Sequence, residues 1–269
     1  MDEPEGARTF AVTGKTYDNF MGRYSGPLAR LFADAAGVST GQRAVDVGCG
    51  PGALTSVLVE RLGADAVLAC DPSPPFVEEC ARRHPGVEVL PGRAEALPFA
   101  DRGCDAALAQ LVLHFVTDPS RAAREMARVV RPGGVVAACV WDFAEGMQML
   151  RAFWDAALAL DPEAPDEATT LRFGGPGEIV GLFADAGLEN IEESTLRVSS
   201  TYPDFDELWD GFLAGVGPAG AYLVALPEER RAGLRVELWP QLDQPEGALP
   251  LGAVARCAVA HVPVDNTPG

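Results

Sequence analysis

The sequence predicts an α/β protein in which a mostly parallel sheet carries helices on both faces. Three observations lead to this prediction. Between residues 43 and 141, short apolar and β-branched runs alternate with segments of helical period. The runs are separated by about 10–15 residues, the length that a crossover helix between parallel strands requires. A glycine-rich turn, Gly48–Gly52, joins the first predicted strand directly to a helix.

The elements of this core follow one another in a regular order. Five strands are predicted at Arg43–Val47, Ala66–Cys70, Val87–Leu90, Asp105–Gln110 and Gly134–Trp141. Three helices are predicted between them, at Gly52–Leu62, Pro75–His84 and Ser120–Val130. Because such crossovers are right-handed, the carboxyl ends of the strands share one edge of the sheet, where folds of this kind bind ligands.

Further elements flank the core on both sides. A helical leader is predicted at Asp18–Met21 and Pro27–Ala36. After the core, helices are predicted at Met147–Leu160, Pro176–Ala186, Phe205–Val216 and Pro227–Leu238, and late strands at Asn190–Ser200 and Ala253–His261. A loop rich in Pro, Asp and Glu is expected at 161–168.

The composition is that of a globular protein and argues against several classes of partner. The 269 residues carry a formal charge of −18 at pH 7, so the chain repels phosphate backbones and we expect no nucleic-acid partner. Met1–Glu5 lacks the basic start of a signal peptide, and no apolar run approaches the ~18 residues of a spanning helix. We therefore expect a cytoplasmic protein without a membrane partner.

The six cysteines are scattered, with no C-x-x-C pair and no histidine at metal-ligand spacing. Such a distribution predicts neither a metal site nor a disulfide framework. Several cysteines lie inside apolar runs, where they are expected to act as small core residues.

The turn Gly48–Gly52 is the first candidate site. Glycines permit a positive φ and let a backbone come close to a ligand. The pattern is ambiguous by itself, because Gly48, Gly50 and Ala53 also fit the fingerprint of dinucleotide-binding proteins. A tight turn without any ligand is the plainer alternative.

Three neighbouring features narrow this choice. Asp46 is an acid inside an apolar strand end, where it needs a donor or a cation and would repel a pyrophosphate. Asp71 ends the second strand about 20 residues beyond the glycines, a position suited to accept two ribose hydroxyls. The loop Gly92–Phe99 follows the third strand and could present N–H groups and apolar side chains to an adenine.

Together these residues resemble the class I S-adenosylmethionine-dependent methyltransferases, in the broad group of ubiquinone- and menaquinone-biosynthesis-type enzymes. The resemblance implies a Rossmann-like, seven-stranded, mostly parallel sheet whose last strands are antiparallel. It covers roughly residues 15–141 and fades beyond them. The matching motifs are Val45–Gly52, Asp71–Ser73, Glu95–Phe99, Asp105, Gln110–His114, Arg131–Gly134 and the leader Tyr17–Tyr24.

The resemblance also implies a role for individual residues around S-adenosylmethionine. Gly48, Cys49 and Gly50 would flank the methionine part and the ribose, and Asp46 would help to hold the ammonium. Asp71 would bind the ribose hydroxyls, and Pro72 would pack on the adenine. The remaining implied contacts are Ala94 and Glu95 at the adenine, Gln110 at the methionine part, and Tyr17 and Arg23 closing over the carboxylate.

One position departs from the family pattern. Many relatives carry Asp where this chain has Arg93, and that Asp reads the adenine amino group. A guanidinium cannot accept a hydrogen bond. Glu95 or backbone carbonyls must therefore replace it, or the adenine is held mostly by packing.

His114 is the candidate catalytic base, since an imidazole near neutrality can remove a proton. Its alternative is a packing role, which this position often has in the family. The same choice between core and binding pocket applies to an aromatic and methionine set in the later segments. Its members are Phe143, Met147, Met149, Phe153, Trp154, Phe173, Tyr202, Trp209, Phe212, Tyr222 and Trp239.

We interpret the whole chain as one methyltransferase domain. Its parts are a leader at 1–42, a cofactor-binding core at 43–141, lid insertions at 142–175 and 203–250, and remaining elements at 176–202 and 251–269. The expected reaction is methyl transfer to O, N or C of a small, largely apolar acceptor, giving S-adenosylhomocysteine, with a base optional. A monomer or homodimer is expected. The alternatives are an NAD-dependent oxidoreductase and a non-catalytic S-adenosylmethionine-binding regulatory module.

Overall fold

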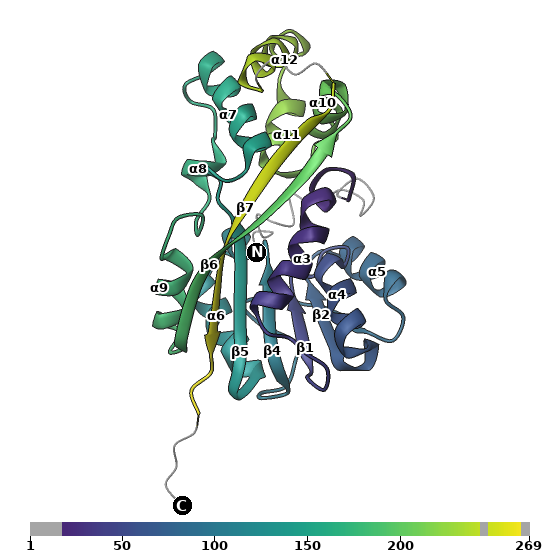
Figure 1. The fold of residues 1–269 in the computed structure, drawn as a ribbon, viewed down its shortest axis with the longest axis vertical. Helices are drawn as coiled ribbons and strands as arrows, with labels where there is room; N and C mark the ends of the chain where they lie inside the picture. Colours follow the sequence, from purple (N-terminus) through teal and green to yellow (C-terminus); the bar gives the residue numbers. More distant parts are fainter. Residues whose placement is uncertain (1–17, 243–246, 265–269) are drawn as a thin grey trace, which may run out of the picture.

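A computed structural model of the protein describes residues 18–242 and 247–264. These residues form a seven-stranded sheet in the order β3-β2-β1-β4-β5-β7-β6, with helices on both faces (Figure 1). The predicted Rossmann-like α/β fold is confirmed. The strands are β1 (Ala44–Val47), β2 (Val67–Asp71), β3 (Glu88–Pro91), β4 (Cys104–Gln110), β5 (Val130–Trp141), β6 (Glu189–Tyr202) and β7 (Leu249–His261).

The strands of the core run parallel, from β3 through β2, β1 and β4 to β5. β7 pairs antiparallel with both β5 and β6, so the antiparallel end that the resemblance implies is present, and β7 is the strand that runs against the others. Its insertion between β5 and β6 distinguishes the sheet from the order 3-2-1-4-5-6 of dinucleotide-binding enzymes.

Alternate residues of each central strand face opposite helical layers. Ala106 and Leu108 share a core with α3 and α4, whereas Ala107 and Ala109 share a second core with α6 and α9. This burial on both faces explains the continuous apolar runs of the strands. The helices around the sheet are α3 (Arg23–Ala35), α4 (Ala53–Leu62), α5 (Pro74–Arg83), α6 (Pro119–Val129) and α9 (Glu178–Asp185).

The last two strands extend well beyond the rest of the sheet. Residues 255–261 of β7 pair with both neighbours, while residues 249–254 pair with β6 alone. The free part is a two-stranded ribbon that reaches into a separate group of helices (Figure 1). That group comprises α7 (Gln148–Leu160), α10 (Phe205–Leu213), α11 (Gly217–Ala225) and α12 (Glu228–Gln241), and α8 (Glu167–Thr170) follows α7 nearby.

Two short helices were not expected from the sequence. α11 forms at a Gly- and Pro-containing segment that is typical of a loop, and the helix predicted at Phe205–Val216 ends earlier, at Leu213. A Cβ at Gly220 would lie 2.8 Å from the backbone of Gly215, so the glycine allows α11 to pack closely. α8 begins within the predicted loop 161–168, because Asp166 caps it by accepting from the backbone N–H of Ala168.

The described residues also bear on the expectations for membrane helices, cysteines and metal ligands. None of their helices is both long and apolar enough to cross a membrane. All six cysteines are buried and free. Within 18–242 and 247–264, no group of three or more His, Cys, Asp or Glu side chains is placed to hold a metal ion.

Candidate active site

A cavity opens at the carboxyl ends of β1, β2 and β4, the edge where the sequence predicts ligand binding. It encloses about 1140 Å³ of space, including open solvent at its mouth. Its far side is lined by Phe143, Leu150, Glu167 and residues 216–219. The cavity brings together these sequence-predicted residues: Asp46, Gly48, Cys49, Gly50, Asp71, Pro72, Gln110 and His114.

The glycine turn is built by backbone hydrogen bonds to β2. The N–H groups of Gly48 and Cys49 both donate to the carbonyl of Cys70, over 2.8 and 3.0 Å. Gly48 has a φ of +69°, and a Cβ on it would lie 2.5 Å from the side chain of Val112. Only glycine therefore fits both the conformation and the space at this position.

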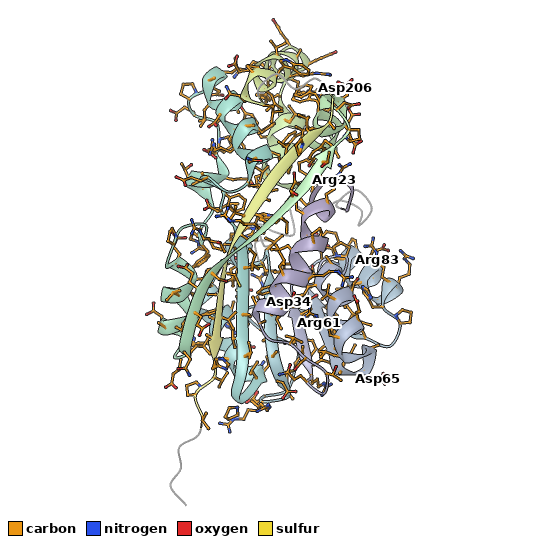
Figure 2. The ribbon with its side chains drawn as sticks, in the orientation of Figure 1. Arg23, Asp34, Arg61, Asp65, Arg83 and Asp206 are labelled. Carbon is orange, nitrogen blue, oxygen red and sulfur yellow. The ribbon has the colours of Figure 1, made fainter. Side chains whose placement is uncertain are left out.

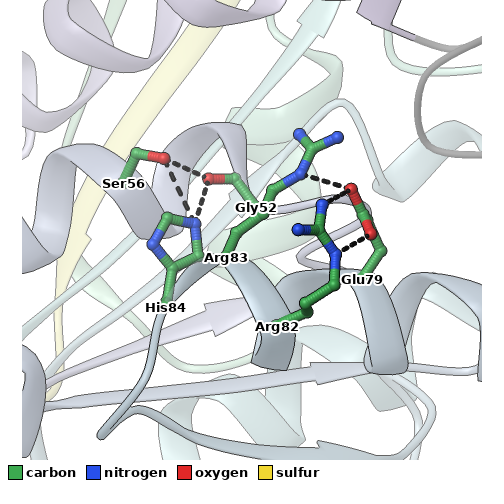
Figure 3. Close-up of polar contacts among 6 residues, drawn as sticks. All are labelled: Gly52, Ser56, Glu79, Arg82, Arg83 and His84. Atoms are coloured by element: carbon green, nitrogen blue, oxygen red, sulfur yellow. Dashed lines mark hydrogen bonds and ion pairs between the residues drawn. The ribbon is translucent and has the colours of Figure 1, made fainter.

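His84 supports the far end of the same turn (Figure 3). Its Nε2 lies 3.2 Å from the carbonyl oxygen of Gly52 and 3.2 Å from Oγ of Ser56, which in turn donates to that carbonyl. Gly52 has a φ of +100°, and a Cβ there would lie 2.6 Å from the imidazole. His84 thus has a structural role that its sequence context did not suggest.

Asp46 is a buried carboxyl at the end of β1. Its Oδ2 accepts a 2.6 Å hydrogen bond from Oγ1 of Thr55, the first-turn residue of α4 that faces it. Burial raises the pKa of Asp46 to about 7, and the hydrogen bond from Thr55 opposes this shift. A cation bound beside it would restore the ionised form.

Asp71 stands at the end of β2, on the other side of the glycine turn. Its Oδ2 accepts from the N–H of Gly50 at 2.9 Å, and its Oδ1 accepts from the N–H of Ser73 at 2.8 Å. These bonds hold both oxygens in place. Burial raises the pKa of Asp71 to about 6, and the two hydrogen bonds oppose this shift. Each carboxylate oxygen keeps further lone pairs for donors of a ligand.

Gln110 ends β4 at the centre of the cavity edge. Its Nε2 donates to the carbonyl of Ser25 at 3.0 Å, whereas its Oε1 is buried without a hydrogen-bond partner in the described part of the chain. The next residue, Leu111, has a φ of +62°, a strained conformation for leucine that often occurs at functional sites. No sequence pattern around Leu111 indicates this strain.

His114 lines the cavity and is 7% exposed. Its ring meets Phe143 edge-on, with centroids 5.3 Å apart, and its Nδ1 has no hydrogen-bond partner among the described residues. Burial lowers the pKa of His114 to about 3. The imidazole is therefore neutral at pH 7 and packed like a core residue, although it faces the cavity.

Glu167 is a lining residue that the sequence analysis missed. It is 3% exposed, and its Oε2 accepts from the indole Nε1 of Trp154 at 2.8 Å. Burial raises its pKa to about 7. The signal that could have revealed it is the acid's position directly after the cap residue Asp166, in a segment that otherwise resembles a loop.

The leader carries two predicted cofactor contacts, of which Arg23 does not line the cavity. Tyr17 lies outside the described residues. Arg23, labelled in Figure 2 beside the β6–β7 ribbon, forms an ion pair with Glu207 and lies 4.5 Å from the ring centre of Tyr202. Its guanidinium is therefore engaged with the ribbon and α10 in this conformation.

Two of the predicted adenine contacts, Ala94 and Glu95, also lie outside the cavity lining, whereas the third, Pro72, is part of it. Ala94 is 8% exposed and belongs to the core beneath α6. Glu95 accepts from Arg93 at 3.3 Å and from the backbone N–H of Thr117 at 3.1 Å. The acid and Arg93, which replaces the family's Asp, thus partner each other.

The aromatic set of the later segments belongs mostly to the core. Phe153 and Phe212 stack with ring centres 4.5 Å apart, and Trp154 meets Phe153 edge-on. Of the eleven aromatic and methionine residues considered, Phe143 is the one that lines the cavity. Most of this set therefore has a core role rather than a pocket role. Other apolar residues, such as Phe20 and Trp141, line the cavity.

Comparison with known proteins agrees with this geometry. Residues 45–138 match a family model described as a methyltransferase domain. The demethylmenaquinone methyltransferase of Renibacterium salmoninarum is 40% identical over 105 residues, which cover 39% of this chain and 44% of that protein. The match thus spans less than half of the relative's length. The resemblance to class I S-adenosylmethionine-dependent methyltransferases is confirmed, and the chain carries a methyltransferase domain.

Solved structures share the fold over most of the chain. One is an N-methyltransferase of Haemonchus contortus in complex with phosphomonomethylethanolamine and S-adenosylhomocysteine, with a TM-score of 0.57 and 16% identity, covering 93% of this chain and 57% of that one. Another is the cyclase SpnF, with a TM-score of 0.53 and 21% identity over 89% and 81% of the two chains. At these identities the likeness shows the fold alone.

Proposed function

We propose that the protein transfers a methyl group from S-adenosylmethionine to a small, largely apolar molecule. The observation that carries this proposal is the meeting of Asp46, Asp71 and the glycine turn in one cavity. These groups occupy the end of the cavity at β1 and β2, and the opposite end is lined mostly by apolar side chains. The site thus offers a polar half for a cofactor and an apolar half for an acceptor.

The residues present fit this cofactor. The paired oxygens of Asp71 suit the two hydroxyls of a ribose. The unpartnered Oε1 of Gln110 and the carboxyl of Asp46 are acceptors, as an ammonium group requires. A Cβ at Gly48 would be blocked by Val112, so the turn stays bare and its backbone remains available to the methionine part.

When bound, the sulfonium supplies an electrophilic methyl and a good leaving group, so the protein's task is alignment. Asp71 would orient the ribose, and Gln110 with Asp46 would hold the amino end. Phe143 and Leu150 would exclude water from the acceptor side. Holding the two reacting atoms near ~3 Å in line supplies much of the rate in such displacements. We propose that the segments 142–175 and 203–250 form the lid over this acceptor side.

The oxidoreductase alternative is less well supported. The reversed β7 departs from the dinucleotide-binding sheet order, and Asp46 would repel a pyrophosphate from the glycine turn. The regulatory-module alternative shares the cofactor site and differs only in chemistry. Because the same fold also serves a cyclase, activity needs its own test.

The test is calorimetry with S-adenosylhomocysteine, followed by mass spectrometry of a small-molecule panel incubated with S-adenosylmethionine. We expect micromolar binding, at least tenfold weaker in Asp71→Ala, and unchanged in Asp65→Asn, an exposed acid just ahead of the amino end of β2. Absence of binding, or full binding by Asp71→Ala, contradicts the proposal. Binding without any methylated product would favour the regulatory module.

A further inference from the structure

Glu167 is a buried acid at the acceptor side of the cavity. It lies on α8, in the segment that follows β5 and α7, and lines the cavity together with Phe143 and Leu150. The cofactor residues Asp46 and Asp71 end β1 and β2, and Phe143 follows the end of β5. The spacing of neighbouring strands puts about 14 Å between the ends of β2 and β5. Glu167 is therefore on the side of the cavity that the cofactor leaves to the acceptor.

Within the part of the chain that the structure describes, no cationic side chain forms an ion pair with Glu167. Trp154 donates to Oε2, and the described residues give Oε1 no hydrogen bond. The positive charge of Arg151 acts on Glu167, but Arg151 forms its ion pairs with Asp155 and Asp166, at 2.8 and 2.9 Å. The carboxyl therefore keeps one oxygen to accept from a ligand, and a donor or a positive charge supplied there would offset the cost of burying the acid.

The charged groups of the cavity also favour a cationic ligand. Its described lining contains three carboxyl groups, Asp46, Asp71 and Glu167, and neither Lys nor Arg. Since Asp46 and Asp71 are assigned to the cofactor, Glu167 is the acid left for the acceptor, and an anionic acceptor would lie against it with no described Lys or Arg to balance the charge. A cation with an apolar body would match both Glu167 and the aromatic walls formed by Phe143 and Trp141.

We propose that the methyl acceptor is an apolar amine and that Glu167 binds its ammonium group and takes a proton from it before transfer. This inference rests on the proposed methyltransferase function. It goes beyond that function by naming the acceptor class and a catalytic residue. His114, neutral and without a partner at Nδ1, lies against Phe143 on the same side and can serve as a second hydrogen-bonding group.

The proton and electron balance is complete with the groups named. The acceptor enters as an ammonium ion, and one of its N–H protons passes to the Glu167 carboxylate. The freed lone pair forms the new N–C bond as the S–CH₃ bond breaks, and the electrons of that bond stay on sulfur. The products are a methylated ammonium ion and a thioether, and Glu167 then releases its proton to solvent. Because burial raises its pKa to about 7, Glu167 can both take and release a proton near neutrality.

Three probes of the same shape separate the acceptor classes. They are 2-phenylethylamine, 2-phenylethanol and 3-phenylpropanoate, a cation, a neutral alcohol and an anion. Each is titrated by calorimetry into the full-length protein saturated with S-adenosylhomocysteine. We expect the amine to bind at least tenfold more tightly than the alcohol, and the acid not to bind. Binding of the alcohol or the acid as tight as that of the amine overturns the inference.

The variant Glu167→Gln tests the residue itself. Its amide oxygen can still accept from Trp154, so the local fold should persist, and circular dichroism checks this. We expect at least tenfold loss of amine binding and of N-methylated product, with unchanged affinity for S-adenosylhomocysteine and the alcohol. The matched control is Glu163→Gln, an exposed acid four residues away, which should behave as the native protein. Equal amine binding by Glu167→Gln refutes the inference alone, whereas failure of all proteins to bind S-adenosylhomocysteine refutes the proposed function as well.

Discussion

The two ends of the cavity are built in different ways. The end at β1 and β2 is made of backbone and of acids placed by short motifs, Asp46 through Gly52 and Asp71 through Ser73. The other end is made of side chains from segments far apart in the chain, such as Phe143, Glu167 and residues 216–219. The first end depends on local geometry and the second on the packing of the helical group. Substitutions should therefore separate cofactor binding from the stability of the helices.

The largest expected effect is on stability and lies in the helical group. Phe153 is fully buried and stacks on Phe212. Phe153→Ala should lower the free energy of unfolding by about 3–5 kcal/mol, measured by urea denaturation, because it removes an aromatic ring from the core. S-adenosylhomocysteine affinity of the remaining folded protein should stay within about threefold of the native value. A large loss of affinity would mean that the two ends are not separable.

A substitution in the glycine turn should lower cofactor affinity as well as stability. Gly48→Ala places a Cβ 2.5 Å from Val112, while Gly37→Ala has a similar positive φ and no heavy atom within 4 Å. Both should lose about 1–2 kcal/mol from the left-handed conformation. Gly48→Ala should lose about 1–3 kcal/mol more from crowding, and at least tenfold in S-adenosylhomocysteine affinity. Equal affinities of the two variants would contradict the close approach of the turn to the cofactor.

The acids predict how cofactor binding depends on pH. Burial raises the pKa of Asp46 to about 7 and that of Asp71 to about 6, and a bound ammonium or hydroxyl donor favours the ionised forms. Binding then releases protons below pH 7, so affinity rises from pH 5 to pH 7 and levels off above. For each proton released on binding, the cofactor affinity rises about tenfold per pH unit.

Calorimetry across this range measures the dependence on pH. Asp46→Asn should make the rise shallower, while Asp65→Asn should leave it unchanged. Affinity that falls as the pH rises would contradict the assignment of these carboxyls to the cofactor.

The carboxyl of Asp46 also affects the stability of the protein without its cofactor. The pKa of Asp46 is raised in the folded state, so ionisation of Asp46 favours the unfolded state. The free energy of unfolding is therefore highest below about pH 4, where Asp46 is protonated in both states, and it declines as pH rises toward 7. Asp46→Asn keeps an acceptor for Thr55 and avoids this decline. The variant should therefore gain in urea midpoint relative to the native protein between pH 4 and pH 7. An equal pH dependence of the two proteins would argue against the burial of an ionisable group here.

The smallest effect is expected at His114. Its pKa of about 3 leaves the imidazole neutral, and its ring packs against Phe143. His114→Phe should keep stability within about 1 kcal/mol, as volume-conserving core changes do, and lower N-methylation less than tenfold. Loss of all product with cofactor binding intact would instead identify His114 as an essential catalytic group.

The core could be predicted from the sequence because its signals are local. The apolar run at β1, the bare glycines after it and Asp71 at the end of β2 each depend on neighbouring residues alone. Glu167 could not be found in this way, since its burial requires Trp154 from another helix. α11 was missed because Gly217 and Gly220 are typical of loops, and its packing needs the latter. The pairing of Arg23 with Glu207 joins residues far apart in the chain, which no local pattern indicates.

We expect the cavity to bind a methyl donor with its polar end at β1 and β2. A crystal structure of the complex with S-adenosylhomocysteine tests it most directly. We expect both ribose hydroxyls within hydrogen-bond distance of Asp71, the amino group at Asp46 and Gln110 Oε1, and the sulfur facing the side lined by Phe143 and Glu167. A ribose away from Asp71, or a sulfur turned from that side, would contradict it.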